Sequence, residues 1–195
     1  MEVTSKSLLV RLQSQSVDDR SWQRLIDLYR PLILSWLRKS MLQNQDAEDL
    51  TQEILLVVVR KVGDFVHPGH QGAFRGWLKT ITLNKMRSFW RSRNYRPKAT
   101  GSSQFLDMIE ELEDPGSNLS RLWNEEHDQY VLERLLELME DEFEEKTLQA
   151  FRRTALVSEP AKEVALSLGM SVGAVYVAKS AVLRRIRQEA DGLID

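Results

Sequence analysis

The apolar residues of this chain recur with the period of an α-helix. Between Trp22 and Leu37 they fall at positions 22, 25, 26, 29, 32, 33, 36 and 37, which places them on one helical face. No stretch of the first half alternates between apolar and polar residues over a useful length, so no sheet is predicted there. The pattern predicts an all-α fold.

Local signals divide this pattern into separate helices. Asp18 or Asp19 is placed to cap the first helix, and Pro31 inside it should kink or split it. The acidic stretch "DAEDLTQE" opens a second helix that ends near Gly63. The loop "GDFVHPGHQG" follows, and a third helix then runs to about Arg93 with Phe74, Trp77, Leu78 and Ile81 on its apolar face.

Charge is segregated along the chain, although the net charge is only -2. The segment from Asp107 to Glu145 holds fifteen acids against two arginines, and residues 97–117 are punctuated by Pro, Gly and Ser. We therefore predict two small helical domains, residues 1–96 and 118–195, joined by a flexible acidic linker at 97–117.

The segment "SEPAKEVALSLGMSVGAVYVAKSAVLRRIRQEA" predicts a helix-turn-helix in the second domain. Gly169 can end its first helix and Ser171 can cap its second, with the tight turn "GMS" between them. The second helix of such a motif reads bases in the major groove of DNA, whereas a plain helical hairpin with a basic tail is the alternative. The predicted DNA contacts are Ser171, Ala174, Tyr176, Val177, Lys179, Ser180 and Arg184.

The third helix lies in a run of forty-two residues, Phe65 to Leu106, that contains no acid. A merely solvated face would normally mix both signs of charge, whereas a face for phosphates would exclude carboxylates. Aromatic side chains beside Arg and Lys also suit unstacked bases of a single strand. The residues assigned to this nucleic-acid surface are Phe65, Lys79, Asn84, Arg87, Trp90, Arg91 and Arg93.

The start of the second helix carries a cluster of acids with helical spacing. Like charges three and four residues apart slightly destabilise a helix. The cluster is therefore either a solvated face or a surface for a basic protein partner. Its acids are Asp46, Asp49 and Glu53, with Gln52 adjacent.

The remaining features argue against catalysis and membrane insertion. The chain has no cysteine, and His67 and His70 share a loop without a third ligand, so no metal site and no cofactor are predicted. The basic surface lacks the clustered carboxylates of a nuclease, and we predict no enzyme activity. No signal peptide is recognisable, and the longest apolar run, Ile54 to Val59, is too short to span a bilayer. We expect a cytoplasmic protein.

The chain resembles the extracytoplasmic-function (ECF) sigma factors of the sigma-70 superfamily, in a variant common among planctomycetes. "DAEDLTQEILL" is similar to the family's polymerase-binding helix, and "FRGWLKTITLN" to its promoter-melting helix. "EVALSLGMSVGAVYVAKS" is similar to its −35-reading helix-turn-helix. The sequence departs from the family at Tyr176, Ala178 and Ala181, where Arg or Lys is typical.

This resemblance implies a set of partners and roles. Asp49, Gln52 and Glu53 would meet core RNA polymerase, and Asn84 would hold a flipped base of the non-template strand. Arg87 and Arg91 would follow that strand's backbone. The protein would direct initiation at promoters with −10 and −35 elements, and an anti-sigma factor could regulate it. The alternative is a stand-alone helix-turn-helix regulator that binds duplex DNA without polymerase.

Overall fold

The computed structural model describes residues 7–14, 17–40, 42–70, 72–94 and 102–194. Within this part of the chain all regular elements are helical, apart from one isolated bridge between Asp191 and Ile194. The all-α prediction is therefore confirmed. The α-helices are α1 (Leu8–Leu12), α2 (Asp19–Lys39), α3 (Asn44–Lys61), α4 (Ala73–Asn94), α5 (Ser102–Glu113), α6 (Asn118–Leu138), α7 (Glu145–Phe151), α8 (Ala161–Leu168) and α9 (Val172–Ala190).

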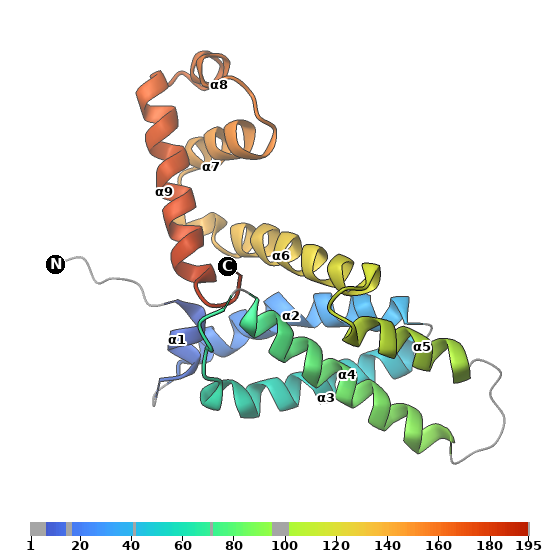
Figure 1. The fold of residues 1–195 in the computed structure, drawn as a ribbon. Coiled ribbons are helices and arrows are strands. Elements are labelled where there is room, and N and C mark those ends of the chain that lie inside the picture. Colours follow the sequence, from blue (N-terminus) through green and yellow to red (C-terminus); the bar gives the residue numbers. More distant parts are fainter. Residues whose placement is uncertain (1–6, 15–16, 41, 71, 95–101, 195) are drawn as a thin grey trace.

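The helices form a long body and a smaller upright lobe (Figure 1). Helices α1 to α6 make the body, and α7, α8 and α9 make the lobe. The far end of α9 returns to the body, so both ends of the described chain lie close to α1. The single large core of the molecule extends from Leu8 to Leu193 and includes residues of both predicted domains.

Helix α2 is the central element of the body, and Pro31 does not split it. Asp18 caps it, because its Oδ1 accepts a hydrogen bond from the Ser21 amide at 2.6 Å. Pro31 has no N–H to donate, which leaves the carbonyl of Asp27, four residues earlier, without its usual helical partner. Arg134 of α6 reaches that carbonyl with its Nε at 3.4 Å. A neighbouring helix thus replaces the hydrogen bond that proline removes.

Helix α6 packs along α2 through aromatic contacts. The rings of Trp36 and Trp123 lie 4.4 Å apart, and those of Tyr29 and His127 lie 5.9 Å apart. Residues 118–138 were assigned to the second domain, yet they bury their apolar side against the first. The predicted linker likewise contains α5, which packs on α6 and stacks Phe105 on Trp90 of α4 at 4.7 Å. In this structure residues 102–113 of the predicted linker are therefore a docked helix and not part of a free tether.

In the lobe, α8 and α9 are joined by a short turn. Gly169 ends α8 with a left-handed conformation (φ 63°), which a residue with a Cβ rarely adopts. Ser171 caps α9, because its Oγ accepts a hydrogen bond from the Ala174 amide at 3.0 Å. No single described helix could span a membrane; α8 and α9 together have the length and composition of a span but meet at 102°.

The buried carboxylate of Glu189 fastens the lobe to the body. It accepts hydrogen bonds from Arg11 of α1 at 2.7 Å, from Arg24 of α2 at 3.0 Å and from Arg185 of α9 at 3.0 Å. Burial by itself would raise the pKa of Glu189, but the three guanidinium groups lower it to about 2. Glu189 is therefore ionised at neutral pH and ties three helices together.

We predict that Glu189→Gln lowers the free energy of unfolding at pH 7 by about 3 kcal/mol, since it removes the buried negative charge that Arg11, Arg24 and Arg185 share. Because the folded-state pKa lies below the ordinary value of 4.5, the stabilisation is present above pH 4.5 and is lost as the pH falls toward 2. Urea denaturation at several pH values should show the two proteins converging over that range.

As a control, Glu137→Gln, which breaks the exposed pair with Arg134, should cost less than about 1 kcal/mol. An equal deficit for both variants would contradict this account.

Candidate nucleic-acid interface

Helix α4 divides its residues between the core and an outward basic face. Phe74, Leu78 and Ile81 are buried as the apolar stripe predicted. Phe65 packs against Phe74 and Trp77, with ring centroids 5.5 and 5.2 Å away, so its ring closes an aromatic cluster at the edge of the core. That position leaves Phe65 half-buried rather than free to stack on a base.

The other face of α4 carries the residues assigned to single-stranded DNA. Asn84 and Arg91 are exposed, whereas Arg87 forms an ion pair with Glu113 at the end of α5. Trp90 stacks on Phe105 with an interplanar angle of 23°. Arg93 lies within α4, but its side chain is outside the described residues. Apart from Phe65, the residues predicted for this surface therefore lie on one helix, and α5 contacts two of them, Arg87 and Trp90.

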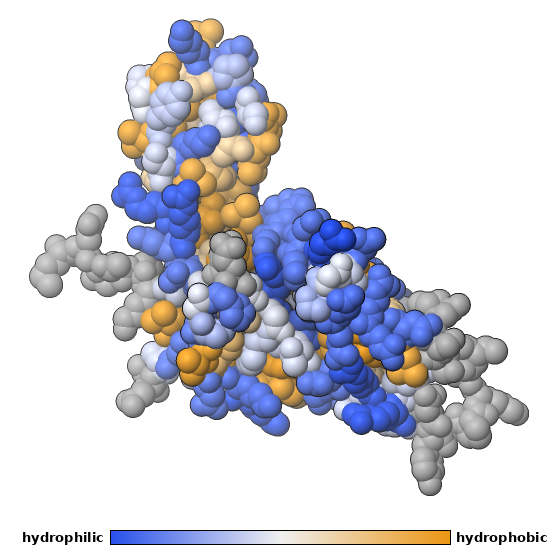
Figure 2. All heavy atoms as spheres, in the orientation of Figure 1, coloured by the Kyte–Doolittle hydropathy of each residue, from blue (hydrophilic) through white to orange (hydrophobic). Residues whose placement is uncertain are grey.

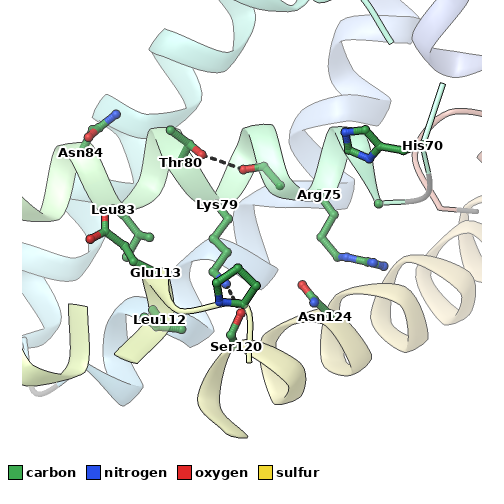
Figure 3. Close-up of a pocket in the computed structure, with 13 residues that line it drawn as sticks. His70, Arg75, Lys79, Thr80, Leu83, Asn84, Leu112, Glu113, Ser120 and Asn124 are labelled. Atoms are coloured by element: carbon green, nitrogen blue, oxygen red, sulfur yellow. Dashed lines mark hydrogen bonds between the residues drawn. The ribbon is translucent and has the colours of Figure 1, made fainter. Parts of the chain in front are cut away.

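A pocket of about 650 Å³ opens between α4 and the α5–α6 turn (Figure 3). Its α4 wall is cationic, with Arg75 and Lys79 beside Asn84. Lys79 donates a hydrogen bond from Nζ to Ser120 Oγ at 2.5 Å. Burial, followed by the nearby charge of Arg75, lowers the pKa of Lys79. The sequence suggests that Lys79 is a freely solvated cation. In the structure, its side chain lines a partly enclosed cavity.

Arg75 is held at the back of this pocket by an ion pair with Asp128 of α6. Burial would raise the pKa of Asp128, but hydrogen bonds from His127 and Arg75 lower it below its usual value. The ring of His127 is buried, and that burial lowers the pKa of His127 despite the neighbouring carboxylate. The group aligns α4 with α6 and is not a metal site: among the described residues no three His, Asp or Glu side chains are close enough to hold an ion.

The acidic helix α3 presents a second candidate surface. Asp49, Gln52 and Glu53 are exposed, and Glu53 also pairs with Lys85 of α4 at 3.0 Å. Asp46 is half-buried at the start of the helix. Leu56 extends the same face and is 54% exposed, although it is a large apolar residue. Sequence reasoning missed Leu56, but its spacing of seven and three residues from Asp49 and Glu53 could have indicated it.

The outward face of α9 is apolar and uncharged over its first turns. Tyr176 is 59% exposed, Val177 is 69% exposed, and Ser180 is also on the surface. Ser171 and Ala174 build the cap of the helix, while Arg184 is exposed three turns later. Lys179 points back into the lobe, where its Nζ lies 3.4 Å from the Thr154 carbonyl. The outward face of α9 therefore exposes Tyr176 and Val177, and apolar residues are visible over the surface of the lobe (Figure 2).

Two comparisons agree with this geometry. Residues 25–96, which include α3 and α4, match the family model of sigma-70 region 2. The chain is also 30% identical over 103 residues to the "ECF RNA polymerase sigma factor BldN" of Streptomyces coelicolor. That match covers 53% of this chain and 37% of the relative's length.

The matched residues 25–96 thus include the acidic α3 and the basic α4 of the body. Over this region the chain is similar to sigma-70 proteins, and over 103 residues it is 30% identical to an ECF sigma factor.

Proposed function

We propose that this protein is a sigma factor that directs RNA polymerase to specific promoters. The observation that carries the proposal is the match of residues 25–96 to sigma-70 region 2, the segment that contains both the acidic face of α3 and the acid-free face of α4. A stand-alone regulator would use the helix-turn-helix lobe and leave both of these faces without a role.

The polymerase would bind the α3 face formed by Asp49, Gln52, Glu53 and Leu56. Exposed carboxylates around one exposed leucine resemble the core and rim of a protein interface, in which a buried apolar centre is surrounded by polar groups. Asp46, at the start of the same helix, would orient that interface. The partner's complementary surface would be basic.

Promoter opening would use α4 and the pocket beside it. A base that leaves the duplex loses stacking and needs a replacement surface. Trp90 offers a stacking plane, Arg87 and Arg91 offer phosphate contacts, and Asn84 at the pocket rim offers amide hydrogen bonds. The protein would perform no covalent chemistry.

The −35 element would be read in the major groove by α9. Tyr176 and Val177 cannot form the bidentate contact with guanine that Arg or Lys makes, but they suit the C5-methyl group of thymine. Ser180 could bond either kind of base edge, and Arg184 could hold a phosphate. We therefore expect a −35 element that is read partly through thymine methyl groups.

The first test is initiation by core polymerase with this protein, with transcript sequencing to map the promoters used.

Arg91→Glu should lower formation of heparin-resistant open complexes at such a promoter at least tenfold, because it replaces a phosphate contact with repulsion. Arg30→Glu is the matched control, since Arg30 is an exposed arginine of the same body on α2, and it should change open-complex formation less than twofold. Absence of any ternary complex would contradict the proposed function.

The role of the α3 face is tested separately. Leu56→Ser should weaken binding to core polymerase about tenfold, because a central apolar contact is lost. Its side chain is already half-exposed, so the free energy of unfolding should change by less than about 1 kcal/mol. Affinity measured by fluorescence anisotropy and stability measured by urea denaturation separate the two effects. Unchanged polymerase affinity would exclude Leu56 from the interface.

Replacing thymine by uracil in the −35 element removes only the methyl group. Binding of the polymerase complex to a duplex with this change should weaken by about three- to tenfold at a contacted position. A Val177→Ser protein should bind both duplexes alike, while Leu166→Ser, on α8 and 87% exposed, should retain the full preference for thymine. Equal sensitivity to uracil in all three proteins would show that Val177 does not read the methyl group.

A further inference from the structure

Helix α5 bridges α6 and the basic face of α4. Its apolar side, Phe105, Ile109 and Leu112, is buried, while its other side carries four acids and no base. Phe105 lies nearly parallel to Trp90, with ring centroids 4.7 Å apart. Glu113, at the end of the helix, forms an ion pair with Arg87. Both α4 residues that it contacts were assigned to nucleic acid from the sequence alone.

The chemistry of these contacts copies that of a nucleic-acid strand. An aromatic ring stacked on Trp90 occupies the position of an unstacked base, and a carboxylate beside Arg87 occupies the position of a phosphate. Leu112 and Glu113 also line the pocket opposite Lys79 and Asn84 (Figure 3). One segment of the chain therefore occupies the stacking and phosphate positions and lines the pocket beside them.

We propose that α5 is an intramolecular substitute for single-stranded nucleic acid and competes with it for the outward face of α4. This inference rests on the proposed function, because it takes α4 as the strand-binding helix. In the free protein α5 covers part of the surface, and a strand gains access when α5 leaves. While α5 is docked, single-stranded nucleic acid that the protein meets by chance cannot bind this face of α4.

Several features make α5 displaceable. The Arg87–Glu113 pair is partly exposed, with 31% and 44% of the two side chains accessible, and ion pairs of this kind contribute little stability. The helix has only twelve residues, so it is marginal in water once undocked. Its four carboxylates, Asp107, Glu110, Glu111 and Glu113, would also repel an approaching phosphate backbone.

The test uses the full chain without polymerase and a fluorescent single-stranded DNA of twelve randomised nucleotides. Glu113→Gln should bind this probe about two- to fivefold more tightly than the wild type, the range expected for loss of one weak ion pair. Glu110→Gln removes the same charge from an exposed position one turn earlier, and it should stay within twofold of the wild type. The double variant Phe105→Ala/Glu113→Gln should gain at least tenfold. Equal gains for Glu113→Gln and Glu110→Gln would indicate a general charge effect and overturn the inference.

A distance measurement reports the movement of α5 itself. The chain has no cysteine, so spin labels at Lys61→Cys on α3 and Glu111→Cys on α5 can be placed without side reactions. Both positions are exposed and lie outside the proposed strand contacts. Adding the probe DNA should broaden and lengthen the distance between the labels. If the probe binds and the distance is unchanged, the inference is wrong and the strand-binding face still stands.

The same experiment separates this inference from the proposed function. In one outcome, the distance between the two labels is longer in the double variant than in the wild type while no variant binds the probe. That result would show that α4 is not a strand-binding surface. In that case the proposed role of α4 in strand binding is wrong, and the inference about α5 is wrong as well. Initiation by the polymerase complex, assayed independently, then decides what remains of the sigma-factor proposal.

Discussion

The packing of α6 along α2 is the contact on which the rest of the structure depends. It buries Trp123 against Trp36 and His127 against Tyr29, and it supplies the Arg134 donor to the Asp27 carbonyl that Pro31 leaves without an amide partner. Because α6 is fixed in this way, α5 at one end is held over α4, and the lobe at the other end begins at a defined point. Burial keeps the pKa of His127 low, so this interface favours a neutral imidazole.

Segregation of charge explains how one chain can contain both a nucleic-acid surface and its cover. Acids are absent between Phe65 and Leu106, which leaves α4 with a basic face. They return immediately afterwards in α5, which is the next element in sequence and has a short reach back to α4. The ion pair between Arg87 and Glu113 joins the two regions directly. The basic face of α4, which would attract phosphate because it lacks acids, therefore also attracts the acidic helix α5.

Particular residues show where prediction from the sequence succeeded and where it failed. The caps at Asp18 and Ser171 and the helix end at Gly169 were predictable, since they depend on backbone groups a few residues away. Lys179 belonged to the right helix, yet its direction is set by a carbonyl twenty-five residues away. Leu56 was missed because an apolar residue was taken as core, although its helical spacing from Asp49 and Glu53 places it on their exposed face.

The sequence by itself determined the helices, their ends and the separation of charge, because each of these follows from spacing and from local hydrogen bonds. Only the tertiary structure decided that residues 102–113 would dock as a helix rather than form part of a tether, and that residues 118–138 would pack on the first domain. That choice depends on ring and carboxylate contacts between segments far apart in the chain, such as Trp36 with Trp123 and Arg11 with Glu189. Such contacts have no periodic signature, since their partners are brought together only when the helices pack.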